Sequence, residues 1–99
     1  NDSYDAVTRT IHWDPYSALR TTSGGTQSPA LGLGHEADHA IVNAGRAAPG
    51  WNTRVRAYDD LEEQRVIRGS EAHAARTLGE SARHNHRGST YRVASPIDR

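Results

Sequence analysis

The chain has 99 residues, of which 34% are hydrophobic, and its twelve basic residues balance twelve acidic ones. This length predicts one domain with a small core, and the absence of cysteine excludes disulfides and thiolate metal sites. The zero formal net charge argues against a nucleic-acid partner, and no apolar run approaches the ~18 residues that a membrane-spanning helix needs.

The N-terminal part of the chain is expected to contain one strand. Residues 1–6 have the composition of a frayed end or a linker. Residues 7–15 alternate between two faces, one of which carries Val7, Arg9, Ile11 and Trp13. This period of two predicts a strand that Pro15 ends. Residues 20–27, rich in Gly, Ser and Thr, are predicted to form a loop.

Residues 28–45 have the start and stop signals of a helix, with Ser28 as the N-cap, Pro29 at the first helical position and Gly45 at the C-terminal end. One stripe of this helix holds Leu31, His35, His39 and Val42. Further apolar residues cover most of the opposite side: Ala30, Leu33, Ala37, Ala40, Ile41 and Ala44. A helix that is apolar on two sides predicts a buried central element.

The remainder of the chain predicts a second helix between two irregular segments. Residues 46–60 are expected to be a loop with a short extended piece around Val55. Residues 60–79 predict a helix that bends or breaks at Gly69 and ends at Gly79, with Asp59 or Asp60 as its cap. The tail is mostly loop, with a strand-like stretch at residues 91–93.

The sequence His35-Glu36-Ala37-Asp38-His39 fits the pattern HExxH. On a helix, histidines four apart lie one turn apart on the same face and can bind one tetrahedral zinc ion. Glu36 then lies on a neighbouring flank, where its carboxylate can take a proton from a water on the metal. A solvated polar helix face is the alternative interpretation, but the histidines share their stripe with Leu31 and Val42.

A catalytic zinc site needs a third protein ligand and one open position, and no third histidine follows at the HExxHxxGxxH spacing. A carboxylate from the second helix is therefore expected, and the candidates are Glu62, Glu63 and Glu71. A helical wheel puts Glu63 and Glu71 on the apolar side and Glu62 on the other side. We predict Glu63 as the ligand, keep Glu62 as the alternative, and assign Glu71 a possible part in orienting a ligand.

Residues 80–99 offer groups that can stabilise an oxyanion opposite the metal, namely Arg83, His84, His86 and Tyr91. The preferred candidates are His86 and Arg83, followed by Tyr91. A solvated basic loop is the competing interpretation of this segment.

Three stretches resemble the small zincin-like metallopeptidase toxin domains of bacterial polymorphic toxins and type VI secretion effectors. They are SPALGLGHEADHA, YDDLEEQRVIRGSEAHAARTLGE and ARHNHRGSTYRVASP, and the resemblance covers about residues 7–96. It implies a secreted or delivered zinc hydrolase with His35 and His39 as ligands, Glu36 as base and a ligand from the Glu62–Glu63 pair. It also implies a cognate immunity protein as a partner. Asp38 departs from the pattern, because many relatives carry an apolar residue there.

The expected fold is α+β, a minimal zincin in which a short antiparallel sheet packs on the HExxH helix and a second helix supplies the glutamate. We expect one domain over residues 1–99, the C-terminal module of a larger polypeptide, which hydrolyses peptide bonds in proteins of a target cell. Two alternatives remain, a peptidoglycan amide hydrolase and a non-catalytic binding module that a zinc ion stabilises.

Overall fold

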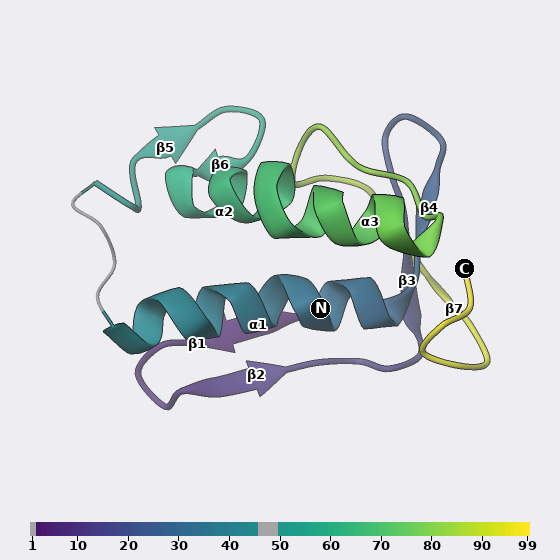
Figure 1. Cartoon of the computed structure of the whole chain (residues 1–99), viewed down its shortest axis with the longest axis horizontal. Helices are drawn as coiled ribbons and strands as arrows, with labels where there is room; N and C mark the ends of the chain where they lie inside the picture. Colours follow the sequence, from purple (N-terminus) through teal and green to yellow (C-terminus); the bar gives the residue numbers. More distant parts are fainter. Residues whose placement is uncertain (1, 46–49) are drawn as a thin grey trace.

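The computed structural model describes residues 2–45 and 50–99 and has two helical segments with three small sheets (Figure 1). The strands are β1 (Ser3–Asp5), β2 (Thr10–His12), β3 (Ser17–Arg20), β4 (Thr26–Gln27), β5 (Arg54–Val55), β6 (Asp59–Asp60) and β7 (Ser89–Arg92). The helices are α1 (Pro29–Gly45), α2 (Leu61–Val66), a π-helical turn η1 (Ile67–Glu71) and α3 (Ala72–Leu78). The predicted α+β class is confirmed.

All three sheets are antiparallel. β1 pairs with β2, β5 pairs with β6, and β3 lies between β4 and β7 with Ala18 opposite Tyr91. The strand-like stretch predicted near residue 91 is therefore β7, the edge strand of the three-stranded sheet. The extended piece predicted around Val55 corresponds to β5. β3 and β4 lie in segments for which no strand was predicted.

The prediction for the first fifteen residues was wrong in two respects. Residues 3–5 form β1 instead of a frayed end, and the strand predicted over 7–15 shrinks to β2. Residues 6–9 form the turn between them, and Val7 is 93% exposed at its tip. The cause is local, because the Asp5 carboxylate accepts hydrogen bonds from the backbone N–H groups of Val7 and Thr8.

α1 occupies the middle of the molecule, as predicted, between the β1–β2 hairpin on one side and the α2–η1–α3 segment on the other (Figure 1). Its stripe of Leu31, His35 and His39 is buried. The second apolar side is not covered throughout, since Ile41 is 75% exposed. No helix in the described ranges, 2–45 and 50–99, is long and apolar enough to span a membrane.

The second helix spans the predicted residues and is interrupted where Gly69 predicted a bend. Asp60 caps α2 by accepting a hydrogen bond from the Glu63 N–H, and Gly79 ends α3 in the left-handed conformation. Between them, η1 contains Gly69 with non-helical dihedral angles. Val66 and Ile67 are fully buried at this junction and form the centre of a small apolar core.

Candidate metal centre

The HExxH segment lies in the interior of α1, with the side chains of His35, Glu36 and His39 all less than a tenth exposed. The four-residue spacing brings the two imidazoles onto one face, and their Nε2 atoms lie 3.1 Å apart. The Glu63 Oε1 atom, from α2, is 2.8 Å from both Nε2 atoms. Two nitrogens and one carboxylate oxygen from two helices therefore converge on one point.

The outer nitrogen of His35 is held by a buried carboxylate. His35 Nδ1 donates to Glu71 Oε1 at 2.7 Å, and Glu71 is 2% exposed. Both Nε and Nη2 of Arg83 donate to the same carboxylate at 2.8 Å, and Gln27 donates to it at 3.3 Å. Glu71 thus has the orienting position that the sequence suggested for it.

The outer nitrogen of His39 has a matching arrangement. His39 Nδ1 donates to Glu62 Oε2 at 2.8 Å, and Arg65 donates from Nε and Nη2 to both oxygens of this carboxylate. Arg65 also bonds Asp38, which accepts from the Ser70 hydroxyl as well. The departure from the family pattern at Asp38 therefore has a structural explanation, because its carboxylate links α1 to α2 and η1.

These contacts fix the tautomer of each ring and with it the properties of the converging atoms. Because Glu71 and Glu62 accept hydrogen bonds from Nδ1–H, each neutral imidazole keeps its proton on Nδ1 and presents the lone pair of Nε2 to the centre. Two lone pairs and a carboxylate oxygen then face one another and require a cation between them. Ligand atoms of a tetrahedral zinc ion are about 3.3 Å apart, within about 0.5 Å of the separations in this cluster.

His35, His39 and Glu63 can therefore hold a divalent metal ion, and the histidine–carboxylate pairs are the usual support for such ligands. Glu62 cannot join them, since its carboxylate lies behind His39 on the Nδ1 side. Of the two carboxylates considered from the sequence, the geometry favours Glu63.

Without a metal, protons take the place of the cation. Burial alone would lower the pKa of His35, but hydrogen bonds to Glu63 and Glu71 outweigh it and raise the pKa to about 9. The pKa of His39 is raised for the same reason, against its burial. Burial would raise the pKa of Glu63, but the hydrogen bonds from both histidines depress it strongly. A metal ion at this point competes with these shared protons.

Glu36 lies beside the cluster on α1. One of its carboxylate oxygens lies within 4.8 Å of a ring nitrogen of His35 and one of His39. Burial raises the pKa of Glu36 above its usual value. Its carboxylate is thus near enough to act on a water at the centre, and the raised pKa suits a proton acceptor.

The loop after α3 brings His86 and Arg83 to the same place. The ring of His86 lies nearly parallel to that of His35, with centroids 5.7 Å apart, and its Nε2 is 3.6 Å from Glu63 Oε1. Arg83, predicted as an oxyanion donor, donates hydrogen bonds from Nε and Nη2 to the Glu71 carboxylate. Tyr91 lines neither of the two cavities below, and the ring of Tyr91 lies under the Arg20 guanidinium. His84 is exposed.

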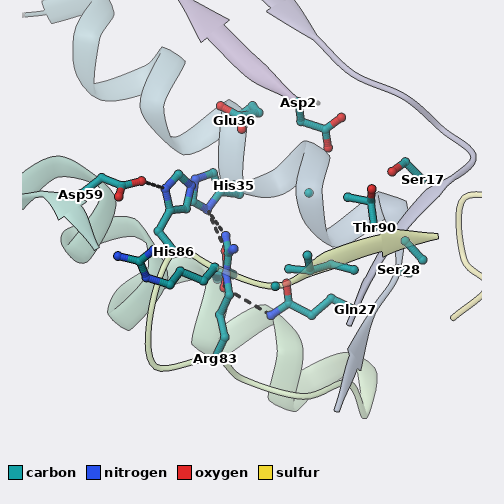
Figure 2. A pocket seen from close by; sticks show the side chains of 16 residues that line it. Asp2, Ser17, Gln27, Ser28, His35, Glu36, Asp59, Arg83, His86 and Thr90 are labelled. Atoms are coloured by element: carbon teal, nitrogen blue, oxygen red, sulfur yellow. Dashed lines mark hydrogen bonds and ion pairs between the residues drawn. The ribbon is translucent and has the colours of Figure 1, made fainter. Parts of the chain in front are cut away.

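Two cavities of about 360 and 340 Å³ open on the centre, one on each side. They share Asp2, Glu36 and His86, so these three side chains lie where the two spaces meet. The larger cavity extends toward β3 and β7, with Gln27, Ser28 and Thr90 among its lining residues (Figure 2). The smaller one lies under Tyr4 and Trp51.

The π-helical turn explains how Glu62 and Glu71 both face α1. In a regular α-helix, residues nine positions apart project about 180° apart, since each residue turns the chain by about 100°. The wheel that put Glu62 on the opposite side was therefore wrong about its burial, because Glu62 is only 8% exposed. The interruption at Gly69 rephases the helix between the two carboxylates.

Sequence reasoning missed Asp2 and Asp59, which reach the site from β-hairpins distant in the chain. Asp2 lines both cavities, and Asp59 bonds His86 (Figure 2). Neither has a local signal, apart from the adjacent acidic pair at 59–60 that was assigned to helix capping. In comparisons with known proteins, no family model, curated protein or solved structure matches the chain.

Proposed function

We propose that this domain is a zinc metallopeptidase that acts on proteins or peptides as a toxin or effector module. The supporting observation is the convergence of His35 Nε2, His39 Nε2 and Glu63 Oε1, with Glu36 buried beside them. Two imidazoles and one carboxylate are the ligand set of zinc peptidases. The chain has no cysteine for a soft metal, and imidazole ligands suit a metal of intermediate softness such as zinc.

In this proposal zinc, when bound, supplies a Lewis acid that polarises a carbonyl and lowers the pKa of a water molecule. Glu36 accepts the proton of that water at its carboxylate and passes it to the leaving amine nitrogen. His86, with a proton on each ring nitrogen, keeps Nδ1–H on Asp59 and donates Nε2–H to the oxygen of the attacked carbonyl as negative charge develops there. Arg83 and Arg65 act through Glu71 and Glu62, which hold the two imidazoles in place.

The zincin-like fold, the delivery into a target cell and an immunity protein rest on the sequence resemblance. The two cavities beside the cluster support a substrate that occupies both, since they share Asp2, Glu36 and His86 as lining residues. We propose a protein or peptide substrate and neither nucleic acid nor membrane lipid, given the balanced charge. Co-purification with the product of a neighbouring gene tests the immunity partner.

The decisive experiment compares the wild type with Glu36→Ala. Metal analysis should give one zinc per chain in both proteins, whereas mass spectrometry of an unstructured peptide mixture should detect new termini only with the wild type. Asp98→Asn, a change of an exposed carboxylate near the C-terminus, is the control and should behave like the wild type. Full hydrolysis or full toxicity of Glu36→Ala overturns the proposal.

A zinc-stabilised module without catalysis is the second candidate, and the position of His86 favours it. With His86 Nε2 at 3.6 Å from Glu63 Oε1, a small ring movement would supply a fourth protein ligand. X-ray absorption of the zinc-loaded protein separates the two, since three protein ligands plus water indicate an enzyme and four protein ligands a structural site. For the peptidoglycan alternative, toxicity only on delivery to the periplasm is the distinguishing result.

A further inference from the structure

Asp59 contacts the ring of His86 directly. Its Oδ2 atom accepts a hydrogen bond from His86 Nδ1 at 2.5 Å (Figure 2). The backbone N–H of His86 donates to the Ala57 carbonyl oxygen at 2.8 Å. The β5–β6 hairpin therefore holds both the backbone and the ring of His86.

The backbone of Asp59 has a φ of +73°, in the left-handed region, immediately before the residue that caps α2. Aspartate and asparagine enter this region more readily than most other residues that carry a side chain. The Asp59 side chain is 60% exposed, and exposed ion pairs stabilise a fold little, so stability does not account for the contact with His86.

The bond to Asp59 also determines which nitrogen of His86 faces the centre. Because Nδ1 points to Asp59, Nε2 is the atom directed toward Glu63 and the ring lies along the face of His35. His86 lines both cavities, so its Nε2 lies where a substrate would cross from one to the other. A rotated ring would put a C–H group in that place.

We infer that Asp59 is a positioning residue that holds His86 with Nε2 over the metal-ligand cluster, in reach of the substrate carbonyl. Asp59 acts through His86 and does not touch the substrate itself. The inference rests on the proposed peptidase function and adds to it a second pair of residues, Asp59 and His86, supplied by a hairpin and a loop instead of the two helices.

Two substitutions, Asp59→Gly and Asp59→Asn, distinguish a role of Asp59 in positioning His86 from a role in stabilising the fold. Asp59→Gly removes the carboxylate and relieves the left-handed backbone, so the melting temperature should stay equal or rise. Asp59→Asn tolerates the same backbone and keeps an oxygen that accepts from Nδ1–H. Asp98→Asn is the exposed control. All variants are measured as zinc-loaded full chains, with zinc content determined for each.

The kinetic experiment measures kcat and KM separately for one peptide that the wild type cleaves. Asp59→Gly should lower kcat by about 10- to 100-fold, the usual cost of a misplaced catalytic group, while KM and zinc content stay close to the wild type. Asp59→Asn should retain more activity than Asp59→Gly. His86→Gln should lose at least as much as Asp59→Gly. Wild-type kcat in Asp59→Gly, or loss of zinc from it, overturns the inference.

Nitrogen-15 NMR of the histidine rings gives a readout that does not depend on activity. The wild type should keep a proton on Nδ1 of His86 whether or not Nε2 is also protonated, and Asp59→Gly should lose this preference. If the wild type hydrolyses no peptide, the peptidase proposal fails, and the spectrum still decides whether Asp59 orders His86. A wild-type His86 with Nδ1 unprotonated overturns the positioning role.

Discussion

His35 and His39 lie midway along α1 with their Nε2 atoms 3.1 Å apart, and the Nδ1 atom of each ring donates to a buried carboxylate. Each carboxylate in turn bonds an arginine, so the cluster has two parallel histidine–glutamate–arginine chains. One chain is shielded, with Arg83 10% exposed, and the other reaches solvent, with Arg65 41% exposed. The following predictions use this arrangement.

Chelation should lower the melting temperature without unfolding the domain. A metal at about 100 times its dissociation constant adds about 2.7 kcal/mol, which corresponds to about 10 °C or more for a domain of this size. The carboxylate and arginine partners remain bonded in the metal-free protein, so circular dichroism should retain its helical signal. Equal melting temperatures with and without chelator would contradict a metal site.

The ligand and the supporting glutamate of α2 should differ in their effect on metal affinity. Glu63→Ala removes a donor atom and should weaken zinc binding by more than about 100-fold, whereas Glu62→Gln removes only support and should weaken it by about 10- to 100-fold. Competition with a colorimetric chelator measures both. If Glu62→Gln is the more damaging of the two, the assignment of Glu63 as the ligand is wrong.

Glu71→Gln should destabilise the metal-free domain more than Glu62→Gln does. The first substitution leaves the shielded Arg83 without its countercharge, which costs about 3–5 kcal/mol for a buried pair. The second leaves the more exposed Arg65, which keeps Asp38, and should cost about 1 kcal/mol. Urea denaturation in the presence of chelator gives both values, and equal losses would contradict the difference in burial.

Gly88, the one glycine of residues 80–99, should not tolerate a side chain. Its φ is +139°, and a Cβ there would lie 2.5 Å from the Arg20 carbonyl oxygen. Gly88→Ala should therefore disturb the pairing of β7 with β3 and shift His86, two residues earlier. Gly24→Ala is the matched control, because Gly24 also has positive φ but open space around it. We expect about 1–2 kcal/mol for Gly24→Ala and about 1–3 kcal/mol more for Gly88→Ala.

The sequence was most informative where chemistry and helical periodicity agree. The α1 boundaries followed from Pro29 and Gly45, and the pair His35 and His39 followed from their spacing. The expectation that Glu63 joins them came from an apolar wheel, and the structure brings Glu63 Oε1 to both rings. The helix boundaries and the histidine pair are local features, and the approach of Glu63 followed from the expectation that a ligand faces the apolar interior.

Features that depend on contacts between distant segments could not be predicted from the sequence. The β1–β2 turn contains no glycine, and Arg9 adopts a positive φ there, so the usual turn signals are missing. The contact of Asp59 with His86 joins segments 27 residues apart. The burial of Glu62 was missed because the wheel assumed a regular helix through Gly69.

The π-helical turn between Glu62 and Glu71 has a consequence for how this sequence can diverge. A residue gained or lost between these two positions would swing one carboxylate away from its imidazole, because each residue rotates the helix by about 100°. Exchanges of residue type at exposed positions of the same stretch, such as Arg68, leave both partners where they are. Descendants of this chain should therefore vary at the exposed positions of this stretch and hardly at all in its length.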